Sequence, residues 1–243
     1  MATSSNPVLT RAGFAEARTA GATMTVGGTI AKTGALFCLL VAAASYAWSR
    51  ASSLTAGTDV GTLVFVGVLG GFGVAIYTTF RPEHARYTAP IYAVLEGLFL
   101  GAISAMFNAR YRGLPVQAVM LTMATFAVML VLYRTRVLRA TERFKTIVVS
   151  CTVSVMAFYV IAFVMGLFGL RIPFLYEGGV IGIGFSLFVT ALAAFNLILD
   201  FDLIEQGVGR APAEFEWFAA FGLTVTLVWL YLEILRLLSK MRR

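Results

Sequence analysis

Three acidic residues, Glu96, Asp200 and Glu233, lie inside or at the edge of long apolar runs. Their surroundings are PIYAVLEGLFLGAIS, FNLILDFDLIEQG and WLYLEILRLLSK, in that order. An ionised carboxylate in an apolar medium is costly unless a proton, a cation or a hydrogen-bond donor compensates it, so such groups usually face a cavity or a partner. Carboxylate oxygens are also the ligands that Ca²⁺ prefers. These residues therefore predict proton binding and weak cation binding.

Asp200 and Glu233 each have a polar neighbour on the same expected helix. Asn196 precedes Asp200 by one turn, and Arg236 follows Glu233 by three positions, so the members of each pair share a helical face. An alternative interpretation gives neither acid a function: Asp200 is solvated at the membrane interface, and Glu233 forms only a local ion pair. For Glu96, the deepest acid by position, a structural contact between helices is as good an interpretation as a functional site.

Membrane-spanning helices must position these acids. A bilayer core of about 30 Å requires roughly 20 apolar residues per spanning helix, and seven segments meet or nearly meet this length. Lipid offers no partner for a free backbone amide, and the alternation of a β-barrel is absent, so we expect helices. The predicted spans are 31–49, 60–80, 88–107, 114–133, 146–170, 179–200 and 214–238.

The composition supports an integral membrane protein. Hydrophobic residues make up 59% of the 243 residues and charged residues only 13%, whereas a soluble domain carries about 25% charged residues. Residues 1–29 are polar and small, so we expect a flexible N-terminal segment followed by one seven-helix transmembrane domain over residues 30–243. No cleavable signal is visible, so the first apolar run is predicted to remain as an anchor.

The remaining residue types argue against several classes of site. Cys38 and Cys151 lie inside apolar runs and are interpreted as small buried hydrophobic residues, and the single histidine, His84, cannot build a zinc site with them. The basic residues form no stripe with interleaved aromatics, so nucleic acid is not an expected partner. No nucleophile–base pair, phosphate loop or cofactor motif is present, so we expect neither an enzyme nor a bound cofactor.

The basic residues also predict the orientation in the membrane. With the N-terminus inside, the inner segments carry eleven Lys and Arg residues and the outer loops four, which favours a cytoplasmic N-terminus. Seven crossings would place the basic tail from Arg236 to Arg243 outside, against this rule, so a re-entrant last helix is the alternative. The preference for Arg over Lys suggests a bacterial source, and hence the bacterial inner membrane.

Small residues recur within several spans, including Gly97 and Gly101 as a GxxxG pair. Such residues let helices approach closely where hydrophobicity provides no drive for association. Close packing is therefore the main interpretation of these glycines, and a ligand path along them is the alternative.

Two segments near the C-terminus resemble motifs of the Bax-inhibitor-type (transmembrane Bax inhibitor motif) family. LYLEILRLL, from Leu230 to Leu238, is similar to the LYLDxxNLF pattern of that family's last helix, and ILDFDLIEQ, from Ile198 to Gln206, resembles its YDxxxI segment. The short basic turn after the second span, which includes Arg81, and the small-residue-rich third span fit the same layout. The ending of the chain resembles a bacterial branch of the family.

This resemblance implies six helices around a central C-terminal helix, with a pH-sensitive pair of acids on the last two helices. By motif position the pair is Asp200 and Glu233. Two carboxylates in contact at low dielectric cannot both ionise cheaply, so they would share a proton, and they would bind Ca²⁺ only weakly. Glu233 stands where the family has Asp, and 33 positions separate the two acids, so they can meet only if the connection first turns away from Asp200. Four polar residues near the spans are accessory candidates: Glu96, Asn196, Arg81 and Arg236.

The resemblance therefore implies a pH-sensitive calcium-leak channel whose partners are the lipid bilayer, Ca²⁺ and protons. Two alternatives stay open. A proton-coupled secondary transporter also uses intramembrane acids, and uphill transport driven by a proton gradient would distinguish it. A non-transporting regulator of a membrane protease is the second alternative, and its role would survive neutralisation of both acids.

Overall fold

The computed structural model describes residues 22–52, 57–169 and 179–242. Apart from one isolated β-bridge, the regular structure in these ranges is helical, and seven helices are long and apolar enough to cross a membrane. The all-α membrane fold predicted from the sequence is confirmed. The helices are α2 (Val26–Ser52), α3 (Gly57–Phe80), α4 (Ala85–Arg110), α5 (Leu114–Arg134), α6 (Glu142–Leu167), α8 (Val180–Gly207) and α9 (Phe215–Met241), and a short 3₁₀ helix, η1 (Pro82–His84), precedes α4.

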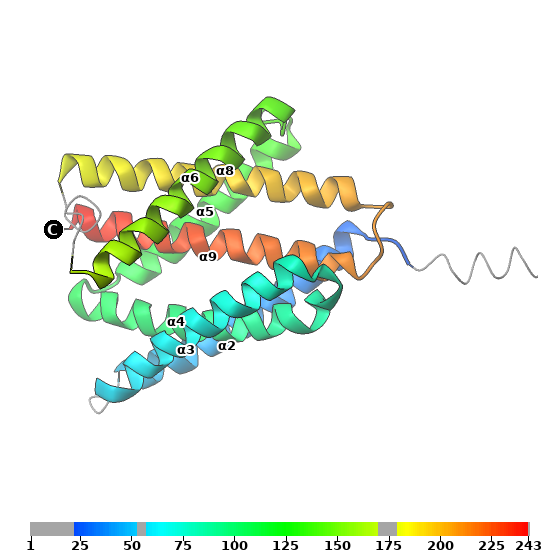
Figure 1. Ribbon diagram of the computed structural model, residues 1–243. Helices are drawn as coiled ribbons and strands as arrows, with labels where there is room; N and C mark the ends of the chain where they lie inside the picture. Colours follow the sequence, from blue (N-terminus) through cyan, green and yellow to red (C-terminus); the bar gives the residue numbers. More distant parts are fainter. Residues whose placement is uncertain (1–21, 53–56, 170–178, 243) are drawn as a thin grey trace, which may run out of the picture.

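The C-terminal helix α9 lies at the centre of the bundle (Figure 1). It packs against α2, α4, α5 and α8, and 72% of its most apolar stretch is buried inside the protein, against 11% for α3 and 50% for the η1–α4 span. Since α9 is one continuous helix of 27 residues, it is about 40 Å long and can cross a whole bilayer. The central position of the last helix is confirmed.

Helix α8 runs further than the sequence predicted, to Gly207 instead of residue 200. Its last two turns carry acidic side chains that pair with basic residues at the end of the bundle, so the helix continues past its apolar part. Asp202 pairs with Lys145 at 2.8 Å, and Glu205 pairs with Arg136 at 2.5 Å. A short connection, residues 208–214, then returns the chain directly into α9.

The GxxxG pair of α4 lies where the backbone of this helix comes close to that of α2. A Cβ added to Gly97 would collide with the carbonyl oxygen of Leu40, and one added to Gly101 would collide with that of Ala44. Only a hydrogen in place of the side chain permits this approach of two backbones. The structure therefore supports close packing as the role of these two glycines.

The residues just before α2 are docked against the connection between α8 and α9. Thr23 forms a β-bridge with Pro212, and the side chain of Met24 is buried. Helix α2 begins at Val26, four residues before the predicted start of the transmembrane domain at residue 30. The greater part of the predicted flexible segment, residues 1–21, lies outside the described residues.

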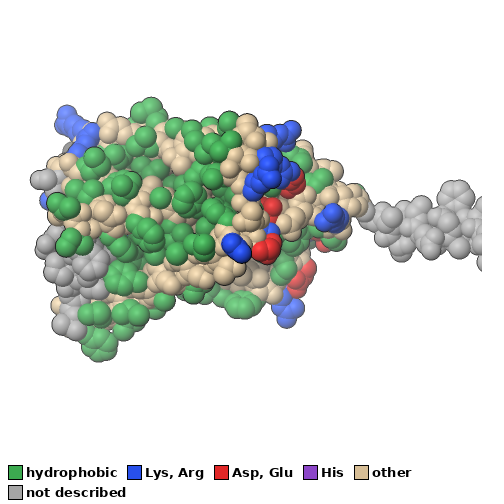
Figure 2. All heavy atoms as spheres, turned by 90° about the horizontal axis from the view of Figure 1, so that it is seen from above, with side chains coloured by type: hydrophobic (Ala, Val, Ile, Leu, Met, Phe, Trp, Pro, Cys, Tyr) green, Lys and Arg blue, Asp and Glu red, His purple; other side chains and the backbone are tan. Residues whose placement is uncertain are grey.

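The surface has the pattern of a protein that spans a bilayer. Figure 2 shows apolar side chains over the middle of the visible face, while basic and acidic side chains gather at the end where α8 is joined to α9. An apolar belt next to a charged end matches the hydrocarbon core and the interface of a membrane. The protein is an integral, multi-pass membrane protein.

Candidate functional site

Asp200 lies on α8 and faces α9. The two helices are antiparallel neighbours joined by the short connection 208–214. Residues of α8 and α9 that are equally many positions away from the centre of this connection therefore lie side by side. This register places Asp200 beside Gly222 and, one turn further on, Thr226. A Cβ added to Gly222 would lie 4.0 Å from Asp200 Oδ1, and the Thr226 hydroxyl interacts with the carboxylate. The missing side chain at Gly222 leaves room for the acid.

Two buried side-chain atoms among the described residues lack a hydrogen-bond partner, and both belong to α8 and α9. They are Asp200 Oδ2 and Trp229 Nε1. The Thr226 hydroxyl has a single proton and also donates to the Gly222 carbonyl oxygen, at 3.2 Å. It therefore cannot donate a full hydrogen bond to the Asp200 carboxylate at the same time. A buried acceptor without a donor is destabilising. A proton, a water molecule or a cation fits the chemistry at Asp200 Oδ2.

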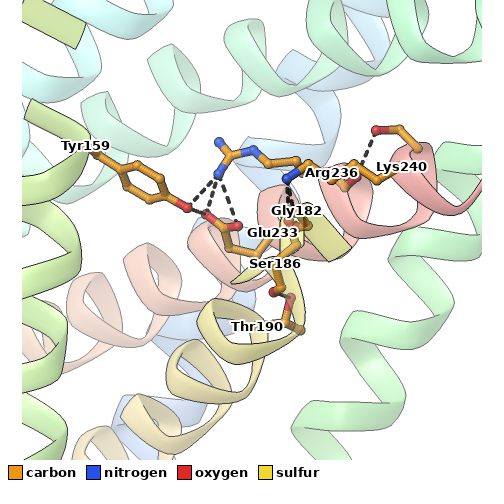
Figure 3. A network of polar contacts seen from close by, with 8 residues as sticks. Tyr159, Gly182, Ser186, Thr190, Glu233, Arg236 and Lys240 are labelled. Atoms are coloured by element: carbon orange, nitrogen blue, oxygen red, sulfur yellow. Dashed lines mark hydrogen bonds and ion pairs between the residues drawn. The ribbon is translucent and has the colours of Figure 1, made fainter. Parts of the chain in front are cut away.

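Glu233 lies further along α9 in a network of its own (Figure 3). Its side chain is buried, and Arg236 Nη1 donates to its two carboxylate oxygens at 3.0 and 3.1 Å. The Tyr159 hydroxyl of α6 donates to Oε1 at 3.0 Å and accepts from Arg236 Nη1 at 2.7 Å. The Arg236 side chain is 38% exposed, so a buried acid is joined to a cation that reaches the protein surface.

The structure does not bring Asp200 and Glu233 into contact. Glu233 follows Thr226 by seven residues, which is about 10 Å along the helix axis. The connection between α8 and α9 does not first turn away from Asp200, as contact of the two acids would require. The expectation of a shared proton and a shared Ca²⁺ between two touching carboxylates is therefore corrected, and each acid has separate neighbours.

No compact metal site takes the place of that pair in the described residues, where no group of three or more His, Cys, Asp and Glu side chains is arranged to hold a metal ion. A carboxylate acting alone supplies few of the six to eight oxygens that Ca²⁺ takes. The site chemistry fits brief contact with a passing cation better than retention of one.

Besides Arg236, the three other accessory candidates lie in three different places. Asn196 Nδ2 donates to Thr152 Oγ1 at 2.9 Å and so ties α8 to α6 one turn from Asp200. Glu96 faces α3, where a Cβ added to Gly71 would lie 2.8 Å from its Oε2. Arg81 pairs with Glu83 at 3.4 Å, with both side chains at least half exposed. Neither Glu96 nor Arg81 belongs to the α8–α9 contact.

One buried cation was missed by the sequence reasoning, which placed Lys240 in the basic tail. Its side chain is buried near the C-terminal end of α9, where Nζ donates to the Gly182 carbonyl oxygen at 3.0 Å and to Ser186 Oγ at 2.9 Å (Figure 3). Its position one turn after Arg236, within an apolar helix, is the signal that could have identified it. No comparable signal marks Tyr159, because a tyrosine in an apolar run also suits a membrane interface.

The acids thus form a series along the central helix. Asp200 meets α9 between Gly222 and Thr226, before the midpoint of that helix, and Glu233 lies after the midpoint. The two acids therefore lie at different levels of α9, on either side of its midpoint.

Comparison with known proteins agrees with this architecture. A family model described as Bax inhibitor 1 like matches residues 6–243, nearly the whole chain. No curated protein and no solved structure matches the chain.

Proposed function

The chain belongs to the Bax inhibitor 1 like family, and from this premise we propose that it is a pH-sensitive calcium-leak channel. The membrane is the bacterial inner membrane, and the N-terminus is cytoplasmic. Asp200 is the proton-sensitive group in this proposal. Glu233, with Arg236, forms a second step of the ion path.

The observation that carries the proposal is the carboxylate oxygen of Asp200 that has no donor. It is buried between α8 and α9, and Thr226 is the only hydroxyl that interacts with the carboxylate among the described residues. Most buried carboxylates have a cation or several donors around them, because the cost of leaving them bare is high. A group kept in this condition inside a membrane favours a functional role over a structural one.

A proton and a cation compete for this oxygen. When the carboxylate is ionised, it attracts a hard divalent cation into the α8–α9 contact. When it is protonated, it has lost the negative charge that draws the cation in. The leak therefore decreases as the pH falls.

Glu233 acts differently because a cation already compensates it. The Arg236 guanidinium reaches the surface, with 38% of the side chain exposed, so it can move away from the acid and let an ion take its place. The Tyr159 hydroxyl then continues to hold the carboxylate in position. Exchange of one cation for another allows passage without tight binding.

Calcium flux into proteoliposomes over an acidic-to-neutral pH series tests this assignment. Asp200→Asn should flatten the pH dependence of the flux, because the asparagine side chain does not titrate. Asp202→Asn is the matched control: it removes an acid from the same helix, two residues away, whose partner is Lys145 at the end of the bundle. We expect this control to keep the wild-type pH profile.

Glu233→Gln should lower the flux and leave its pH dependence in place, since the acid that titrates is still present. A wild-type pH profile in Asp200→Asn would show that the proton acts elsewhere. Uphill Ca²⁺ movement driven by a proton gradient would identify a secondary transporter instead of a leak.

A further inference from the structure

An open groove separates α2 from α5 on the membrane-facing side of the bundle. Helix α2 packs against α4 and α9, and α5 packs against α9 and α8, so the two helices flank α9 with a gap between them. The part of the groove nearer the charged end is a cavity of about 660 Å³. Leu223 and Leu227 of α9 form part of its floor.

The walls of this groove are apolar and face lipid. Ile30 on α2 is 66% exposed and Leu130 on α5 is 41% exposed, and both line the cavity. On α5, the cavity extends from Met123 to Arg134. These twelve residues span about 16 Å, half of a bilayer core of about 30 Å. The groove therefore has the length and the chemistry of one acyl chain of one leaflet.

The charged end of the groove carries a positive excess. Arg134, Arg136 and Glu205 line it together. Glu205 accepts hydrogen bonds from Arg136, at 2.5 Å, and from the Tyr133 hydroxyl, so one basic side chain compensates this acid. The Arg134 side chain interacts with Glu205 electrostatically. Within the described residues, this side chain forms no hydrogen bond or ion pair. Two guanidinium groups against one carboxylate leave one positive charge at the headgroup level.

We propose that this groove is a binding site for one anionic glycerophospholipid. The phosphate lies against Arg134 and Arg136, and one acyl chain lies between α2 and α5 on the floor of α9. Guanidinium groups suit phosphate oxygens because they present several donors in one plane. The apolar walls alone would accept any lipid, whereas the charge at the groove end selects a negative headgroup. The inference does not rest on the proposed ion leak.

A glycine provides a way to fill the groove without disturbing the fold. Gly34 of α2 lines the cavity, and a Cβ added there meets no atom within 4 Å. Gly34→Leu therefore places a side chain where the acyl chain would lie. Gly73→Leu on α3 is the matched control: it is similarly open, lies at a similar distance from the same end of the bundle, and does not line the groove.

Native mass spectrometry of the purified full chain tests the proposal with phosphatidylglycerol and phosphatidylcholine of identical acyl chains. The wild type should retain one phosphatidylglycerol and prefer it about fivefold over phosphatidylcholine, the factor expected for one basic residue near an anionic lipid. Gly34→Leu should lose most of the bound lipid, and Gly73→Leu should retain it. Arg134→Gln should still bind lipid but lose the preference for the anionic headgroup.

Leu130→Trp fills the groove from the opposite wall and provides a second test if Gly34→Leu does not accumulate. Equal retention of the two lipids by the wild type would overturn the proposal, and so would wild-type lipid retention in both filled variants. A dimer that disappears when the groove is filled would show that a second copy of the chain is the occupant.

Discussion

Replacing Arg236 with methionine removes the cation that forms an ion pair with the buried Glu233. The carboxylate is 2% exposed and would keep the Tyr159 hydroxyl as its donor. Methionine preserves most of the volume and the apolar stem of arginine. The change therefore isolates the charge from the packing.

The magnitude follows from the geometry of the ion pair. At an N···O distance of 3.0 Å and an effective dielectric constant near 20, the attraction is about 5 kcal/mol. The Arg236 side chain is 38% exposed, and screening by water reduces this value by roughly half. We therefore expect Arg236→Met to lower the free energy of unfolding by about 2–3 kcal/mol, at or just below the lower limit of about 3 kcal/mol for breaking a fully buried pair.

Reversible unfolding in mixed detergent micelles, followed by tryptophan fluorescence, measures this difference. Glu233→Gln should cost about 1 kcal/mol, because Arg236 can turn toward water. The double variant Glu233→Gln/Arg236→Met should cost little more than Glu233→Gln, which gives a coupling energy of about 2 kcal/mol. Arg81→Met is the control: it breaks an exposed pair with Glu83, for which we expect less than about 0.5 kcal/mol.

Two results would refute this reasoning. One is a loss in Arg236→Met no larger than that in the Arg81 control. The other is strict additivity in the double variant, which would mean that the pair contributes nothing beyond the packing of its two side chains.

Three further predictions concern packing, the N-terminal contact and orientation. Gly101→Leu should destabilise the α2–α4 contact by about 1–3 kcal/mol or more, because its Cβ would collide with a backbone carbonyl. Gly73→Leu is the control, because its side chain would point into open space. Equal unfolding free energies for the two variants would contradict this packing. Glu216 accepts hydrogen bonds from the Thr25 N–H at 2.7 Å and from the Thr25 hydroxyl at 3.0 Å. Glu216→Gln should therefore speed hydrogen exchange at the Thr25 amide. Unchanged protection of this amide would show that the contact does not hold the residues before α2. A reporter fused after Arg139 should be cytoplasmic, and a periplasmic signal would reverse the topology.

The number and the placement of the helices could be predicted from the sequence because the bilayer imposes a length and a polarity on every span. Each predicted apolar run corresponds to a helix of the structure, and the family resemblance implied that the last of these helices lies at the centre. The main error in the bounds was at α8, predicted to end at residue 200 and found to end at Gly207. Hydropathy marks where a helix leaves the hydrocarbon core, and α8 continues beyond that point because basic residues from other segments pair with its acids.

The sequence also identified which acids lie in apolar surroundings, since that property depends only on their neighbours along the chain. Which groups these acids meet depended on the rotation of each helix about its axis and on the register between α8 and α9. The short connection sets that register: it places Asp200 opposite Gly222 and leaves Glu233 to Arg236 and Tyr159. Motif positions suggested a pair of touching carboxylates, but a motif contains no measure of how far one helix is shifted along another. Only the tertiary structure decided that Asp200 keeps an oxygen without a donor while Glu233 is held by a cation.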